Sequence, residues 1–177
     1  WHENITFVKL NHVDLVVAHI QEHYYFVLFI ILMLVIAAAI KSAQLPFSSW
    51  LPRAMEGPTT SSAVFYGSLS VHLGVFLLLR TYPYWETIGV AKIFIIAIGV
   101  VTAIIATAIA NVQASVKTQI AYSSIAQIGI MFVEVAMGWH VLVLVHLVGN
   151  ALLRTYQLLV SPSVLGYMVH DQFFNFQ

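Results

Sequence analysis

Two histidines and a glutamate lie inside long apolar stretches of this sequence, where titratable side chains are rare. His72, Glu134 and His146 are each flanked on both sides by mostly aliphatic residues. An imidazole exchanges a proton near neutral pH, a carboxylate can do the same, and in an apolar solvent such groups mark functional positions by default. The chemistry that these residue types favour is proton transfer between side chains. For the two histidines, a purely structural hydrogen bond to a neighbouring helix remains the alternative.

Further polar residues accompany these groups at helical spacing. Offsets of 4, 7, 8 and 11 residues place side chains on one helical face. The accompanying residues are Ser61 and Ser68 before His72, Ser123 and Gln127 before Glu134, and Asn150, Arg154 and Gln157 after His146. Hydroxyl and amide groups can orient bridging water between titratable groups. Because arginine hardly ever deprotonates, we interpret Arg154 as a residue that sets the local charge, for example as the counter-ion of Glu134.

Two lysines complete the set of candidate proton-path residues. Lys41 follows the apolar stretch from Tyr24 to Ile40, and Lys117 begins another such stretch. An amine can carry a proton, but a long side chain at the end of a helix can equally extend to the interface. Position alone leaves both readings open for these lysines, and favours the second for Arg80.

The composition indicates the environment in which these groups lie. Of the 177 residues, 60% are hydrophobic and only 8% are charged, and the mean hydropathy is +0.90. Soluble domains carry roughly 25% charged residues. We therefore predict an all-α, polytopic transmembrane helical bundle in the lipid bilayer. Seven basic residues balance seven acidic ones, which argues against nucleic-acid binding. The absence of cysteine excludes disulfides and thiolate metal centres.

Five helices are expected to cross the membrane, each close to the ~20 residues that a bilayer core requires. Their expected bounds are about 24–48, 60–80, 92–112, 117–137 and 139–160. Pro46 and Pro52 predict that the first helix is broken, because proline removes a backbone donor. Residues 1–23 are expected to form an interfacial amphipathic segment, and residues 161–177 a segment that follows the last helix.

No catalytic or metal centre is predicted. His19 and His23 have the spacing of metal ligands, with His12 on the same face, but no acidic or thiolate partner stands beside them. A polar helix face is therefore the preferred reading. No phosphate loop, dinucleotide fingerprint or nucleophile elbow occurs. We expect no cofactor, and at most the ion-translocating part of a larger complex.

Two long motifs resemble one family. The run KSAQLPFSSWLPRAMEGPTTSSAVFYGSL, from Lys41 to Leu69, and the run VQASVKTQIAYSSIAQIGIMF, from Val112 to Phe132, resemble the antiporter-like membrane subunits. These include chain 5 of NADH–quinone oxidoreductase and the large subunit of multisubunit sodium/proton antiporters. The resemblance extends from Lys41 to Val160. It implies two inverted repeats, each with a broken helix, and conduction of protons or sodium along lysines, histidines and glutamates.

The resemblance also assigns individual residues. Lys41 matches the lysine beside the broken helix, Lys117 the lysine of the second motif, and His146 the first histidine of the next helix. Asn150 and Arg154 stand where chain 5 of complex I usually has a histidine and a lysine. The chain would then be an internal fragment that holds the middle of a longer protein.

One stretch narrows the resemblance. NALLRTYQLLVSPSVL, residues 150–165, looks like the membrane subunit of two-component inorganic carbon (CO2/bicarbonate) transporters, whose partner is a large soluble zinc protein. This implies a proton-translocating subunit in the bacterial inner membrane that drives inorganic carbon uptake. Three alternatives stay open: a proton-pumping subunit of NADH–quinone oxidoreductase, a sodium/proton antiporter subunit, and a structural subunit that has lost conduction.

Overall fold

The computed structural model of the chain describes residues 23–161, in which all regular structure is helical. The predicted all-α fold is confirmed. The amphipathic segment with His12 and His19, and the segment after the last helix, lie outside the described residues.

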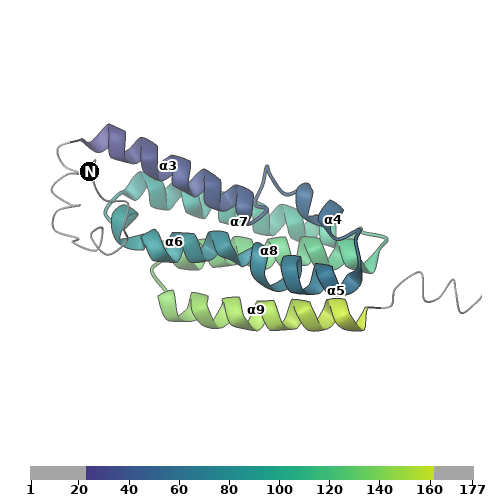
Figure 1. Ribbon diagram of the computed structural model, residues 1–177. Coiled ribbons are helices and arrows are strands. Elements are labelled where there is room, and N and C mark those ends of the chain that lie inside the picture. Colours follow the sequence, from purple (N-terminus) through teal and green to yellow (C-terminus); the bar gives the residue numbers. More distant parts are fainter. Residues whose placement is uncertain (1–22, 162–177) are drawn as a thin grey trace, which may run out of the picture.

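The described helices form one elongated bundle in which the long helices run side by side (Figure 1). In chain order they are α3 (Tyr24–Lys41), α4 (Trp50–Ala54), α5 (Thr59–Ser61), the π-helix η1 (Ser62–Ser70), α6 (His72–Trp85), α7 (Gly89–Asn111), α8 (Val116–Ala136) and α9 (His140–Val160). In this part of the chain, α3, α7, α8 and α9 are long and apolar enough to cross a membrane. Their outward faces carry large exposed aliphatic side chains, which suits contact with lipid rather than water.

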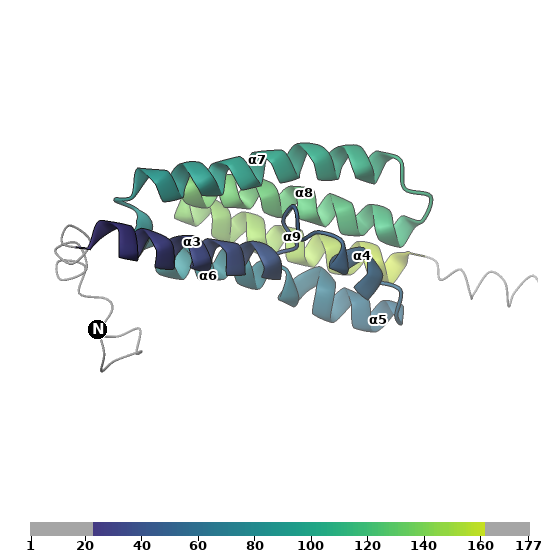
Figure 2. The same ribbon diagram turned by 90° about the horizontal axis from the view of Figure 1, so that it is seen from above.

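The first long helix ends at Lys41, earlier than the expected bound of 48. The backbone N–H groups of Ser42 and Gln44 still donate to α3 carbonyls, but Ala43 adopts a left-handed φ of 52°, which ends the helix. Figure 2 shows that α3 stops about halfway along the bundle and that α4 lies beyond it. Pro46 lies in the connection and Pro52 in the first turn of α4, where a missing N–H leaves no helical bond unmade. The break therefore precedes both prolines.

The helical run expected at 60–80 is not one regular α-helix. It begins as α5, widens into η1, and continues as α6 from His72 to Trp85. A π-helix bonds each N–H to the fifth carbonyl before it, so it holds extra residues in each turn and often accompanies functional positions. The widened segment ends at Ser70, two residues before His72, so the number of residues that it holds affects the direction in which that imidazole points.

Helices α7 and α8 approach each other closely. A Cβ atom at Gly129 would lie 2.7 Å from the carbonyl oxygen of Gly99, so the two backbones meet without an intervening side chain. The connection after α3 is fixed against this pair. The Leu45 N–H donates to Thr102 Oγ1 on α7 (3.1 Å), and Gln44 Nε2 donates to the Ile125 carbonyl of α8 (3.5 Å).

Candidate proton-transfer site

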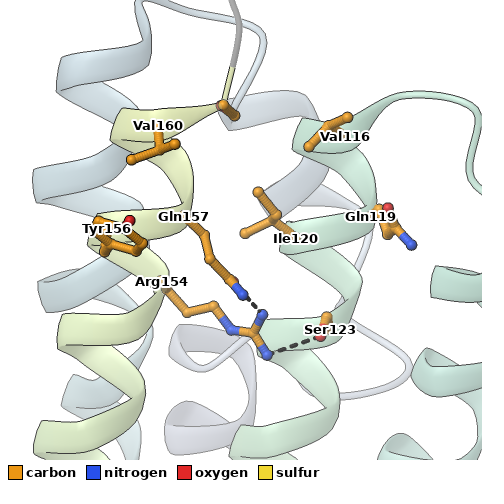
Figure 3. A pocket seen from close by; sticks show the side chains of 9 residues that line it. Val116, Gln119, Ile120, Ser123, Arg154, Tyr156, Gln157 and Val160 are labelled. Atoms are coloured by element: carbon orange, nitrogen blue, oxygen red, sulfur yellow. Dashed lines mark hydrogen bonds between the residues drawn. The ribbon is translucent and has the colours of Figure 1, made fainter.

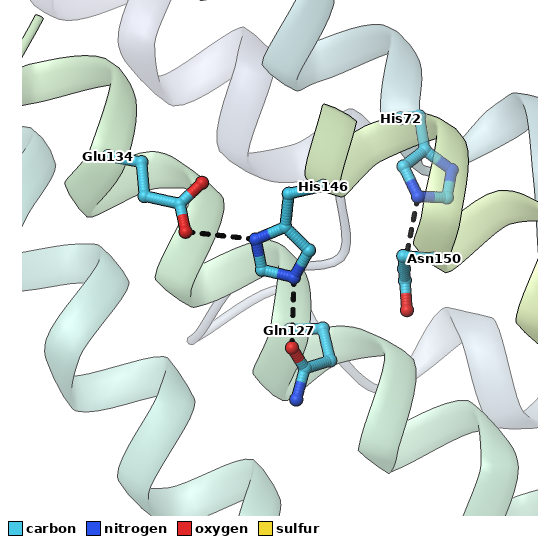
Figure 4. A network of polar contacts seen from close by, with 5 residues as sticks. All are labelled: His72, Gln127, Glu134, His146 and Asn150. Carbon is cyan, nitrogen blue, oxygen red and sulfur yellow. Dashed lines mark hydrogen bonds and ion pairs between the residues drawn. The ribbon is translucent and has the colours of Figure 1, made fainter. Parts of the chain in front are cut away.

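A histidine on α9 joins two polar side chains of α8. His146 Nδ1 lies 2.9 Å from Glu134 Oε1, and His146 Nε2 lies 3.0 Å from Gln127 Oε1. Figure 4 shows the imidazole between the carboxylate and the amide. Both ring nitrogens are therefore engaged, and both face oxygen acceptors.

The local sequence explains why these three side chains are in contact. Gln127 and Glu134 are separated by 7 residues, about two turns, and so share one face of α8. The chain then reverses at Gly138, whose φ of +81° is readily adopted only by glycine. The reversal sets α9 antiparallel beside α8 and brings His146 level with the carboxylate.

Glu134 is buried, with 8% of its surface exposed. Its Oε2 atom has no hydrogen-bond partner in the described part of the chain, so the carboxylate retains a free acceptor. The ion-pair partner of Glu134 there is His146. Arg154, which the sequence suggested as its counter-ion, bonds to other residues.

A second polar group continues along the same face of α9. Asn150 Nδ2 lies 3.1 Å from His72 Nε2, and Arg154 Nε donates to Asn150 Oδ1 (3.3 Å). The remaining nitrogens of Arg154 donate to Gln157 Oε1 (2.7 Å) and Ser123 Oγ (2.8 Å). The polar face predicted for α9 therefore faces the interior of the bundle, and its side chains bond to residues of α6 and α8.

A cavity adjoins residues of both groups. It has a volume of about 310 Å³, and its polar lining residues are Gln127, His146, Asn150 and Arg154. A water molecule occupies about 30 Å³ and needs two to four polar partners. The cavity thus has both the room and the lining for water between the two groups.

The other predicted site residues lie elsewhere. Lys41 is exposed at the end of α3, and Lys117 Nζ donates to the Gly57 carbonyl (3.1 Å). Lys117 precedes Glu134 by 17 residues on α8, which is about 26 Å along the axis. The structure does not bring either lysine into the His146 group. Ser68 belongs to η1, and its side chain is outside the described part.

Sequence reasoning missed several buried polar residues, among them Gln44. Gln44, fully buried after the end of α3, has an Oε1 atom without a partner among the described residues. It stands in a non-helical connection, so no helical spacing could have identified it. Within residues 23–161, no three His, Asp or Glu side chains gather as metal ligands.

Known proteins are similar to this chain in sequence and in fold. The family described as "NADH:quinone oxidoreductase/Mrp antiporter, TM" matches residues 3–175. NADH-quinone oxidoreductase subunit L of Rhodobacter capsulatus is 40% identical over 137 residues, 77% of this chain and 19% of that protein. The probable inorganic carbon transporter subunit DabB2 of Halothiobacillus neapolitanus is 35% identical over 151 residues, 85% of this chain and 27% of that protein.

A solved structure agrees. A chain in the Mrp complex from Dietzia sp. DQ12-45-1b matches 76% of this chain with a TM-score of 0.73 and 31% identity, and 15% of that chain is covered. The present chain thus matches between 15% and 27% of the length of these relatives. The family match, the sequence identities and the fold agree: the chain belongs to the antiporter-like family of membrane subunits shared by NADH:quinone oxidoreductases and Mrp antiporters.

Proposed function

We propose that this chain provides a proton-translocating segment of a multi-pass membrane subunit. The observation that carries the proposal is the contact of His146 with both Glu134 and Gln127, between two helices long and apolar enough to span a membrane. An ion pair buried in such a place is costly to keep for stability alone. A carboxylate and an imidazole in contact can pass a proton between them.

The proposed path follows α9. A proton held between Glu134 and His146 passes, through water in the 310 Å³ cavity, toward Asn150 and His72. Asn150 holds His72 in place from one side, and Arg154 supplies a fixed positive charge because it does not release its protons. Lys41 and Lys117 are proposed as path residues beyond this centre, where α3 ends and where α8 begins.

Proton flux tests the proposal. The full-length protein, with its partner subunits, is reconstituted in liposomes that contain a pH-sensitive dye. We expect Glu134→Gln and His146→Gln each to reduce flux on the order of tenfold or more. His140→Gln is the matched control, because His140 is an exposed histidine at the start of the same helix. Equal flux in His146→Gln and His140→Gln would contradict the proposal.

The two lysines are tested separately. Lys41→Ala and Lys117→Ala are compared with Lys92→Ala, which removes a half-buried lysine near the start of α7. We expect lower flux in the first two variants and normal flux in the third. Unchanged flux in both would remove the lysines from the path and leave the histidine–carboxylate centre standing.

The finer proposal is that the flux drives inorganic carbon uptake in a bacterial inner membrane, together with a soluble zinc-binding partner. One support is the likeness to DabB2. The other is the pair Asn150 and Arg154, which contact each other and stand where chain 5 of complex I usually has a histidine and a lysine. The full-length gene should restore growth at ambient CO2 to a host that lacks carbon uptake, and the protein should purify with a zinc-containing subunit.

A redox complex is the second candidate, favoured by the 40% identity to subunit L. It predicts co-purification with quinone-reducing subunits and no growth rescue. An antiporter, favoured by the Mrp neighbour, predicts proton flux that depends on an opposing sodium gradient. The subunits that purify with the protein, the growth rescue and the sodium dependence of the flux therefore distinguish the three functions.

A further inference from the structure

Arg154 has unused hydrogen-bonding capacity at a buried position. Only 6% of the residue is exposed. A guanidinium carries five N–H groups, and three of them donate to Asn150, Gln157 and Ser123. One N–H on each terminal nitrogen therefore has no acceptor in the described part of the chain. Two such groups are what a planar oxyanion requires for paired contacts.

The positive charge of Arg154 is also unbalanced. All three acceptors are neutral, and no carboxylate among residues 23–161 lies within ion-pair distance of the guanidinium. A buried charge in a membrane-spanning helix is normally paired. An anion bound beside Arg154 would balance this charge.

A cavity of about 520 Å³ adjoins this guanidinium between α8 and α9. Figure 3 shows Arg154 and Gln157 reaching from α9 toward Ser123 on α8. Ser123 Oγ and Gln157 Oε1 both accept bonds from the arginine, so the hydroxyl hydrogen and the amide NH2 of these residues stay available as donors. The polar groups nearest the arginine thus offer hydrogen-bond donors, a combination that suits an anion and disfavours a metal ion.

We infer that this cavity binds a planar monovalent oxyanion of the carboxylate or bicarbonate class, held by Arg154 with Ser123 and Gln157. The oxyanion comes either from a diffusible ion or from an acidic side chain of another segment or subunit. This binding site is an addition to the proposed proton path. It lies beyond Asn150 along α9, and its occupancy can be measured without a proton-flux assay.

Anion-dependent stability tests this site in the purified full-length protein. Thermal unfolding is followed while sodium bicarbonate or sodium formate replaces sodium chloride at constant pH and ionic strength. We expect a saturable rise in the unfolding temperature with both oxyanions. Arg154→Gln should weaken the apparent affinity on the order of tenfold or more. Arg53→Gln, which changes an exposed arginine on α4, should leave it unchanged.

Two further measurements keep the test decisive. If Arg154→Gln does not fold, Ser123→Ala and Gln157→Leu should each weaken the oxyanion effect several-fold. A structure of the full-length protein distinguishes the two sources: an acidic side chain on the Arg154 guanidinium, with no effect of added oxyanion, assigns the site to a fixed carboxylate. No oxyanion effect together with a cavity that holds no anionic group would overturn the inference, as would an equal effect in Arg154→Gln.

Discussion

The close contact of α7 with α8 makes Gly129→Ala a sensitive test of the fold around the proton-transfer site. The added Cβ would lie 2.7 Å from the Gly99 carbonyl oxygen and 3.0 Å from the Ala103 backbone nitrogen. Both are backbone atoms, so no side-chain rotation can relieve the overlap. The helices must separate, and α8 carries Gln127 and Glu134.

The size of the effect follows from two opposing terms. Ordinary contact begins near 3.4 Å, so α7 must retreat by about 0.7 Å to restore normal packing. Overpacking of this kind typically costs about 1–3 kcal/mol, while alanine gains up to about 1 kcal/mol over glycine in a helix. We expect Gly129→Ala to lower the free energy of unfolding by about 1–2 kcal/mol.

Gly149→Ala is the matched control. Gly149 lies in α9, and a Cβ atom there would meet nothing within 4 Å, so only the favourable helix term remains. Unfolding of the full-length protein in detergent, followed by tryptophan fluorescence, should show opposite signs for the two variants. A Gly129→Ala protein as stable as Gly149→Ala would refute the close contact of α7 and α8.

Two other predictions concern the segment where α3 ends. Thr102→Val removes the acceptor of the Leu45 N–H. Because the donor is left without its partner, the variant should lower the free energy of unfolding by about 1–3 kcal/mol in a denaturation assay. The control Thr107→Val removes an exposed hydroxyl that bonds within its own helix, and it should change the free energy of unfolding by no more than about 0.5 kcal/mol. Gly74→Ala sets a Cβ against Ser42 Oγ and a backbone carbonyl of α3, so it should lower the unfolding temperature, and an unchanged temperature would contradict the contact of α6 with α3.

The sequence predicted the face of each polar stripe but not which stripes meet. Helical spacing correctly grouped His146, Asn150 and Arg154 on one side of α9, because periodicity is a local property. The pairing of Glu134 with His146, instead of Arg154, depends on the vertical register of two antiparallel helices. The turn at Gly138 sets that register, and no spacing within one helix reports it.

Backbone features were the least predictable part of the fold. The prolines after Lys41 drew attention to a break, yet the helix ends through the left-handed Ala43, a residue with high helix propensity. The π-helix before His72 likewise has no marker in a single sequence. Contacts with the rest of the bundle override local preference at both places.

The π-helix also determines how this chain tolerates changes in length. Its wide turns accommodate surplus residues between Ser62 and Ser70, and each residue removed from a helix rotates everything beyond it by about 100°. A one-residue deletion in this segment would turn His72 away from Asn150 without altering any side chain of the α8–α9 centre. The contact of His72 with Asn150 therefore depends on the length of this segment as much as on the identity of the histidine that follows it.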